Sequence, residues 1–414
     1  MTQRKAAGPL TGMRVIDAGV IFAGPLVGTL LGDLGADVIK IEHPKGDDVR
    51  KTGLFKEGEG LWWRVTARNK RIIAVDMSKP EGCAIVRRLV QSADVLIENF
   101  RPGRFAQWGL GYEALRAVNP GLVMLHISGY GQAGPYSAKP CLGTLAEAFS
   151  GFAAVTGDAD GPPSLPSFPI ADGVAAMAGA YAVVAALWAR EKNGGIGDEI
   201  DLSLYEPLLS LMGSMAIDYD QLGKVAMRHG NRSTWSVPRN AYRTSDDKWI
   251  AISGAANSIA TRMFRAVDRN DLADDPSLST NQQRVKRMDE LDGAIADWIR
   301  AHTEREALDR FEQFEVTAGP VCNIAQLFAD PQVQARGTFV EMTDPVLGPT
   351  RIQDVVPRFT NSAAGMRWLG RRDIGSDTDE VLLELGYTQA EIGALEGGGI
   401  VKRVPRQQTS TVER

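Results

Sequence analysis

One carboxylate stands in a setting that could support chemistry. Asp172 follows Pro169-Ile170-Ala171 and begins an alanine-rich helical stretch. The structural interpretation is an N-cap, a position that aspartate often occupies. The catalytic interpretation is a nucleophile, because a carboxyl with an ordinary pKa of about 3.9 is ionised at neutral pH and attacks electrophiles when partly desolvated. The small neighbours Ala171 and Gly173 would admit a bulky electrophile.

Two further features could bind an anionic ligand. Residues 17–25 (DAGVIFAGP) join a strand-like run to a helix, and backbone amides at a helix N-terminus bind phosphate. Their spacing matches neither GxGxxG nor a Walker loop, so a tight turn is the alternative. Basic residues also gather in two places, where a solvated surface is the alternative to phosphate binding: Arg64, Arg68, Lys70 and Arg71, then Arg101 and Arg104 after a strand.

Metal, disulfide and nucleic-acid chemistry have little support. The three cysteines (Cys83, Cys141, Cys322) lie far apart and are odd in number, which favours a reducing, cytoplasmic setting over a disulfide framework. The four histidines show no metal-ligand spacing, and His126, within an apolar strand, is typical of a core residue. A net charge of −5 argues against a nucleic-acid partner, and we do not expect a metal site.

These residues would be positioned by alternating strands and helices, which predict parallel βαβ units and an α/β, Rossmann-like fold. The expected strands are Arg14–Asp17, Asp37–Ile41, Arg71–Val75, Asp94–Ile97 and Leu122–Ile127. The expected helices between them are Pro25–Leu34, Pro80–Gln91 and Tyr112–Val118.

The 414 residues are enough for more than one domain. We expect a large domain over 1–223, a smaller α+β domain over 224–317, a segment 318–400 that returns to the large domain, and a flexible tail over 401–414. The smaller domain should hold a hairpin around 241–252 and helices over Asn281–His302 and Glu304–Glu315. No export signal is expected at the N-terminus, and the uncharged stretch 173–189 is short for a bilayer span, which favours a core helix.

Taken together, the segments resemble the class III CoA-transferase family, also called the CaiB/BaiF family, which includes formyl-CoA and carnitine CoA-transferases. The resemblance runs in register over roughly residues 9 to 395. The matching blocks include 9–44, 69–82 (NKRIIAVDMSKPEG), 93–103 (ADVLIENFRPG), 128–135 (SGYGQAGP), 156–172 and 318–336.

The resemblance implies an interlocked homodimer and a carboxylate mechanism at Asp172. An acyl-CoA thioester would be attacked to give an aspartyl anhydride, then an aspartyl-CoA thioester, and a carboxylic acid would finally accept the CoA. No cofactor beyond CoA, no membrane and no metal would take part. The residues implied for the CoA site are Val20, Ala23, His43, Val75, Asn99, Phe100 and Lys139, with Arg71, Arg101 and Arg104 as candidates for charge compensation.

Departures from the family pattern bear on this assignment. Gln107 and His43 stand where CoA-contacting arginines are typical, and Val20-Ile21-Phe22 replaces a His-x-Gln pattern. Cys141-Leu142-Gly143 replaces Gly-Tyr-Asp. A 2-methylacyl-CoA racemase would need a histidine at Leu142, which disfavours that alternative. A CoA-binding protein without catalysis is the third hypothesis, and neither substrate acid is identified by the sequence.

Overall fold

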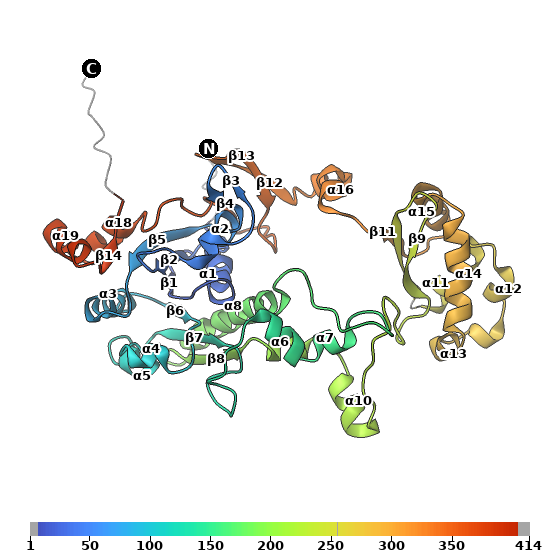
Figure 1. Ribbon diagram of the computed structural model, residues 1–414, viewed down its shortest axis with the longest axis horizontal. Coiled ribbons are helices and arrows are strands. Elements are labelled where there is room, and N and C mark those ends of the chain that lie inside the picture. Colours follow the sequence, from blue (N-terminus) through green and yellow to red (C-terminus); the bar gives the residue numbers. More distant parts are fainter. Residues whose placement is uncertain (1–6, 255, 405–414) are drawn as a thin grey trace, which may run out of the picture. The chain divides into compact units, whose positions relative to one another are not determined.

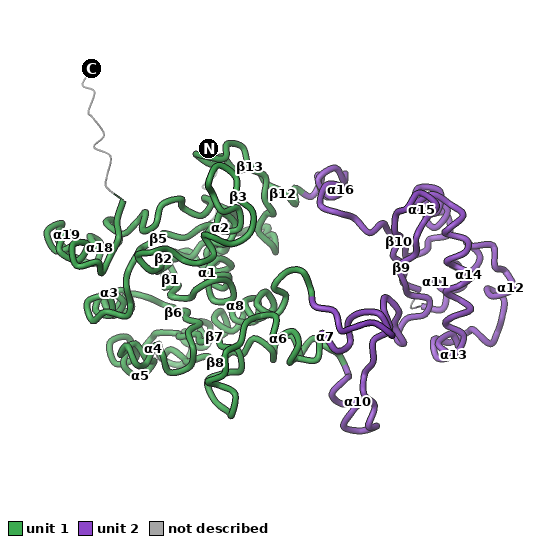
Figure 2. The backbone as a smooth tube through the Cα atoms, in the orientation of Figure 1, with its two compact units in different colours: residues 1–152, 166–213, 337–414 green, residues 153–165, 214–336 purple. Residues whose placement is uncertain are grey.

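A computed structural model describes residues 7–254 and 256–404 of the chain (Figure 1). They form two compact units, each described by itself (Figure 2). The larger unit lies within 1–152, 166–213 and 337–414, and the smaller within 153–165 and 214–336.

The larger unit is built on a seven-stranded sheet in the order β14-β5-β2-β1-β6-β7-β8. All neighbours are parallel except β14, which pairs antiparallel with β5. The predicted α/β class with a parallel sheet is therefore confirmed. The strands are β1 (Arg14–Asp17), β2 (Asp37–Glu42), β5 (Lys70–Val75), β6 (Val95–Glu98), β7 (Val123–Ser128), β8 (Glu199–Ser203) and β14 (Val401–Lys402).

Helices cover both faces of this sheet, which explains why its central strands are nearly continuous apolar runs. One face packs against α3 (Pro80–Val90), α5 (Tyr112–Arg116), α18 (Thr378–Glu384) and α19 (Gln389–Gly397). The other face packs against α1 (Ala23–Asp33) and α8 (Ile170–Arg190). Buried side chains alternate accordingly along β1, where Val15 belongs to one core and Ile16 to the other.

The strand order places a topological switch point between β1 and β6. From β1 the chain winds outward through β2 and β5, and it returns to β6 on the other side before continuing through β7 and β8. Ligands of open α/β sheets bind in the crevice that this reversal creates at the carboxyl ends of the strands. The fold alone therefore directs attention to the loops after β1 and β6.

Shorter elements complete the larger unit. They are the 3-10 turn η1 (Asp48–Lys51), β3 (Phe55–Lys56), β4 (Glu59–Gly60), α2 (Leu61–Thr66), α4 (Arg104–Gln107), α6 (Gly143–Phe149), α9 (Glu206–Ser210), β12 (Phe339–Asp344) and β13 (Gly348–Gln353). Helix α7 (Phe152–Val155) crosses the boundary between the units.

The smaller unit has an antiparallel sheet in the order β11-β10-β9, built from β9 (Arg239–Arg243), β10 (Trp249–Ser253) and β11 (Ala318–Pro320). Its helical elements are α10 (Met215–Leu222), α11 (Asn257–Ala266), α12 (Asn270–Ala273), η2 (Pro276–Leu278), α13 (Asn281–Lys286), α14 (Met288–Arg300), α15 (Glu304–Gln313), α16 (Ile324–Ala329) and α17 (Pro331–Ala335). The single helix expected over Asn281–His302 is two helices that meet at Arg287.

The predicted boundaries differ from these compact units. The expected small domain ends at residue 317, but β11 pairs with β10 and belongs to the smaller unit. Residues 153–165 and 214–223, assigned to the large domain by sequence, also fall in the smaller unit. The flexible tail expected from residue 401 begins too early, because Val401 is buried and pairs with Val75. The remainder of that tail, 405–414, lies outside the described residues.

Helix α8 is 21 residues long and apolar enough to meet the length and composition of a membrane span. Its small residues, including Ala171, Ala175 and Gly179, are buried under the sheet. One face of α8 thus packs in the core, as predicted from 173–189, but only 33% of its most apolar 18-residue window is buried in the single chain.

Candidate active site

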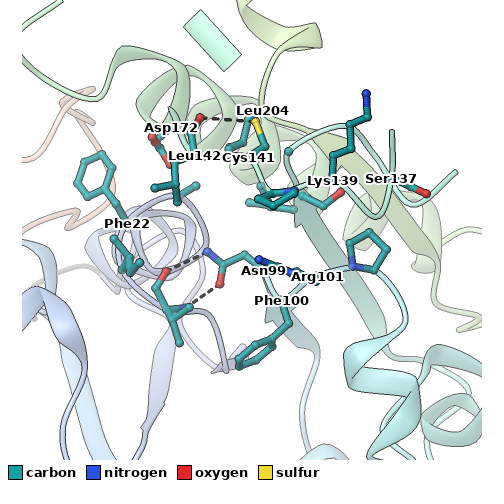
Figure 3. Close-up of a pocket in the computed structure, with 18 residues that line it drawn as sticks. Phe22, Asn99, Phe100, Arg101, Ser137, Lys139, Cys141, Leu142, Asp172 and Leu204 are labelled. Atoms are coloured by element: carbon teal, nitrogen blue, oxygen red, sulfur yellow. Dashed lines mark hydrogen bonds between the residues drawn. The ribbon is translucent and has the colours of Figure 1, made fainter. Parts of the chain in front are cut away.

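A pocket of about 440 Å³ opens at the switch point of the larger unit, between the loops that follow β1 and β6 (Figure 3). Pockets of a few hundred Å³ are typical of small-molecule sites. Its lining residues are Val20, Ile21, Phe22, Ala23, Asn99, Phe100, Arg101, Pro102, Ile127, Ser128, Gly129, Ser137, Lys139, Pro140, Cys141, Leu142, Asp172 and Leu204.

Asp172 lines this pocket from the first turn of α8 (Figure 3). The helix begins at Ile170, and its N-cap is Pro169, which offers no side-chain hydrogen bond. The N-cap interpretation of Asp172 is therefore wrong, because Asp172 lies inside the helix. What remains is a half-buried carboxylate that faces a cavity at the positive end of a long helix.

A second carboxylate, that of Glu147, lies behind Asp172. Its Oε1 accepts hydrogen bonds from the backbone amides of Ile170 (3.1 Å) and Ala171 (3.4 Å). Burial, followed by the negative charge of Glu147, raises the pKa of Asp172 to about 6. The carboxylate is thus mostly ionised at neutral pH and more basic than an ordinary aspartate, which strengthens it as a nucleophile. No sequence pattern pointed to Glu147.

Gly143, the first residue of α6, gives Asp172 the room it occupies. A Cβ added at Gly143 would lie 1.9 Å from Oδ2 of Asp172, far inside van der Waals contact. The amino end of α6 therefore closes directly on the carboxylate. The glycine of the Cys141-Leu142-Gly143 departure has a steric reason at this position.

Asn99 holds one wall of the pocket rather than presenting its amide to a ligand. Its Oδ1 accepts from the Val20 amide (2.7 Å) and its Nδ2 donates to the Val20 carbonyl (2.9 Å). This pair of bonds joins the loop after β1 to the loop after β6. The adjacent Ile21 has a φ of 64°, a strained conformation for a β-branched residue.

Buried ion pairs brace the same loop from beneath. Lys70 Nζ lies 2.8 Å from Asp17 Oδ2, and Lys40 Nζ lies 3.2 Å from Asp47 Oδ2. Lys40 also donates to the Gly19 carbonyl, and Asp17 Oδ1 accepts from the Gly19 amide. The strained loop is therefore held by charges that do not face the pocket. Sequence reasoning identified Lys70 only as part of a basic cluster.

The structure brings seven of the predicted site residues to one pocket: Val20, Ala23, Asn99, Phe100, Arg101, Lys139 and Asp172. It does not bring in His43, Val75 or Arg104. Val75 is buried in the core and His43 is exposed, with its Nε2 3.9 Å from Asp76. Arg104 packs over the Trp108 ring at 5.1 Å.

Arg71 is the clearest correction to the predicted site. It lies near the amino end of β5, whereas the pocket lies at the carboxyl ends of the strands. Its guanidinium pairs with Asp37 (2.7 Å) and Glu384 (2.7 Å). The other arginines of its cluster are also paired within the larger unit, Arg64 with Glu59 and Arg68 with Asp33. Arg71 therefore does not line the pocket, and its guanidinium is paired within the larger unit.

His126 is a core histidine, as its apolar strand predicts. Its ring nitrogens contact the carboxylates of Glu98 (2.5 Å) and Glu199 (3.0 Å). Burial acts to lower the pKa of His126, but the two glutamates outweigh it and the pKa is raised. Glu98 also accepts from the Phe100 amide (2.7 Å), so this buried group supports the pocket loop.

A 2-methylacyl-CoA racemase would need a second base, a histidine, at the position of Leu142. Leu142 lines the pocket there and cannot take a proton. Its neighbour Cys141 also lines the pocket, and burial raises the pKa of that thiol, which keeps it neutral. Among residues 7–254 and 256–404, no cluster of His, Cys, Asp and Glu could hold a metal ion.

Comparison with known proteins defines the class. The model of the family described as CoA-transferase family III matches residues 10–378 of the chain. The chain is 38% identical to the succinyl-CoA–D-citramalate CoA-transferase of Chloroflexus aurantiacus, over 97% of this chain and 100% of that protein. It is 37% identical to the succinate–glutarate CoA-transferase of Agrobacterium fabrum, over 81% and 85% of the two chains.

Solved structures agree with these sequence relatives. A CaiB/BaiF family protein from Brucella suis superposes with a TM-score of 0.79 at 30% identity, over 92% of this chain and 100% of that one. The chain therefore belongs to CoA-transferase family III, and the predicted family and enzyme class are confirmed.

Proposed function

We propose that this enzyme moves CoA from succinyl-CoA to a second carboxylic acid, with Asp172 as the nucleophile. The observation that carries the proposal is the half-buried Asp172 carboxylate in the switch-point pocket, whose pKa is raised to about 6. Such a group combines ionisation at neutral pH with high basicity, which suits attack on a thioester.

In the proposed reaction the Asp172 carboxylate carries the acyl group and then CoA between the acyl-CoA donor and the acceptor acid. Asp172 attacks the acyl carbonyl, the C–S bond breaks and CoA thiolate leaves, which forms an aspartyl anhydride. The thiolate then attacks the Asp172 carbonyl, which releases the donor acid and leaves an aspartyl-CoA thioester. The acceptor carboxylate repeats these two steps in reverse order, so that it takes CoA and Asp172 returns as a carboxylate. No proton or electron is gained or lost overall.

The residues that line the pocket support one orientation of bound CoA. Arg101 and Lys139 are exposed cations on the pocket rim, where they can meet phosphate charge. Apolar groups such as Phe22 and Leu142 lie closer to Asp172 (Figure 3). We therefore assign the phosphate end of CoA to the basic rim and its sulfur to the Asp172 end.

The substrate class follows from the relatives. Succinyl-CoA or succinate appears in the names of both relatives described above, paired with citramalate or glutarate. We propose succinyl-CoA as donor and a short dicarboxylic acid as acceptor.

A donor and acceptor screen tests both parts. Succinyl-CoA is mixed with a panel of mono- and dicarboxylic acids, and the CoA esters are separated by chromatography. Asp172→Asn should lower turnover by at least about 10³-fold while a control, Asp160→Asn at an exposed site of the smaller unit, keeps it. Hydroxylamine added during turnover should modify Asp172, as read by mass spectrometry. Full activity of Asp172→Asn would refute the nucleophile.

We also propose that two copies of the chain associate. The side of α8 that faces away from the core carries an apolar stripe at helical spacing: Met177, Tyr181, Val184 and Trp188. Tyr181 is 71% and Trp188 66% exposed in the single chain. Large apolar patches of this kind mark association surfaces, and a second copy of the chain is the partner that the proposal assigns.

A further inference from the structure

Glu147 is a buried carboxylate that the proposed reaction does not use. It is 2% exposed and lies on α6, 23 residues before the start of α8. Burial of an acidic side chain is costly unless hydrogen bonds compensate it. Its Oε1 obtains two such bonds, from the amides of Ile170 and Ala171.

Those amides belong to the turn that carries Asp172. The first amides of a helix have no partner within the helix, and a cap residue normally supplies one. Pro169, the N-cap of α8, has no side chain that can do so. Glu147 therefore caps α8 from a neighbouring helix: it shares the Ile170 amide with the Phe168 carbonyl and accepts from the Ala171 amide. These bonds tie α6 to the first turn of α8.

We propose that Glu147 is a positioning residue for Asp172: it fixes the turn that bears the nucleophile, and its charge favours acylation of that nucleophile. The inference rests on the proposed function of Asp172. The groups that face Asp172 from the packed elements are the Glu147 carboxylate on α6 and the Cys141 thiol before it.

Acylation removes the negative charge of Asp172. Free Asp172 is negative and is repelled by Glu147, but the anhydride and the thioester of Asp172 are neutral. When Asp172 attacks, its negative charge passes to the CoA sulfur as the C–S bond breaks. Repulsion is therefore relieved on acylation, so the charge of Glu147 raises the free energy of the reactant more than that of the acylated enzyme.

Two substitutions separate the geometric part from the charge. Glu147→Gln keeps an oxygen that accepts from the same amides and removes the charge, whereas Glu147→Ala removes both. We expect Glu147→Ala to lower kcat by about 100-fold through misplacement of the nucleophile. Glu147→Gln should recover most of this loss and stay within about tenfold of the parent. The acidic limb of kcat/KM should move to lower pH in both variants.

The matched control removes a glutamate charge at the C-terminal end of α8, opposite to the end that Glu147 caps. Glu191 is the exposed C-cap residue of α8, and Glu191→Gln should change neither kcat nor the pH profile. Equal rates and identical acidic limbs in the parent, Glu147→Gln and Glu147→Ala would overturn the inference. If Glu147→Ala fails to fold, the pH profile of Glu147→Gln decides alone.

A stability cycle tests the coupling without turnover. The pKa of Asp172 in the folded enzyme is about 6, above its ordinary 3.8. The folded state therefore becomes less stable relative to the unfolded state as pH rises from about 4 to above 6. Asp172→Asn should therefore raise Tm at pH 8 by about 2 °C or more and have little effect near pH 4. The gain should shrink when Glu147 is already Gln.

The two proposals fail in different ways. An Asp172→Asn enzyme that still transfers CoA would refute the nucleophile, whatever the stability cycle gives. Additive Tm shifts for Asp172→Asn and Glu147→Gln at pH 8, in an enzyme that needs Asp172, would refute the charge coupling between Glu147 and Asp172. A Glu147→Ala enzyme that folds and keeps the parent kcat would refute the positioning role.

Discussion

At the scale of single residues, the candidate site depends on contacts between helices that are distant in sequence. Asp172 is set by Gly143, which leaves it space, and by Glu147, which holds its turn. Both lie on α6, whereas Asp172 itself lies on α8. The carboxylate of the proposed nucleophile is thus enclosed by the start of one helix packed against the start of another.

The room at Gly143 leads to a direct prediction. Gly143→Ala should lower kcat by about 100-fold, because the new methyl group would displace Oδ2 of Asp172. The carboxylate tip can rotate away and alanine favours a helix, so thermal stability should change little. Steady-state kinetics and thermal melts measure the two effects. Gly293→Ala, in a helix with open space around it, is the control, and an active Gly143→Ala enzyme would contradict the steric argument.

Some of the side chains predicted from sequence line the pocket, and ion pairs hold others elsewhere. Asn99 and Arg101 line the pocket from the loop after β6, and Asp172 lines it from the first turn of α8. Arg71 does not, because it lies near the amino end of β5, where Asp37 and the distant Glu384 pair with its guanidinium. A local cluster of positive charge carries no information about such distant partners. Glu147 was missed for the same reason.

At the scale of elements, the pocket lies between the loop after β1 and the loop after β6, which the Asn99 side chain joins by hydrogen bonds. The strand order alone places these loops side by side, since β1 and β6 are neighbours at the switch point. Apolar runs predicted both strands from sequence. They did not predict β8 or β14, because β8 alternates polar residues and β14 has only two residues.

Removal of the Asn99 amide should weaken substrate binding. Asn99→Ala leaves the Val20 amide and carbonyl without their partners, and KM for succinyl-CoA should rise by about tenfold. The control is Asn119→Ala, which removes side-chain hydrogen bonds to the Val90 and Ala93 carbonyls. Asn119 precedes β7 and lies at the amino ends of the strands, whereas the pocket lies at their carboxyl ends. That variant should lose stability with KM unchanged. An equal KM in both variants would contradict the role of the fastened loops.

At the scale of the whole molecule, the apolar stripe of α8 predicts the assembly state. Tyr181→Lys combined with Trp188→Glu should convert a dimer to a monomer, because charges replace the apolar contacts of the proposed interface. Light scattering coupled to size-exclusion chromatography measures the mass. Val118→Lys, an exposed site after α5 on the opposite face of the sheet, should leave the mass unchanged. A monomeric parent enzyme would contradict the proposed association.

The antiparallel strand β14 also bears on how the chain folds as it is made. Synthesis runs from the N-terminus, so every residue of the smaller unit leaves the ribosome before Val401 is added. Asp377 and Thr378, which are made earlier, already accept from the Ile72 and Ala74 amides on this edge of β5. Until Val401 follows, only the carboxyl end of that edge, around Val75, lacks its partner strand. A nascent chain halted before Val401 would therefore carry all residues of the smaller unit while the carboxyl end of β5 still lacked its antiparallel neighbour.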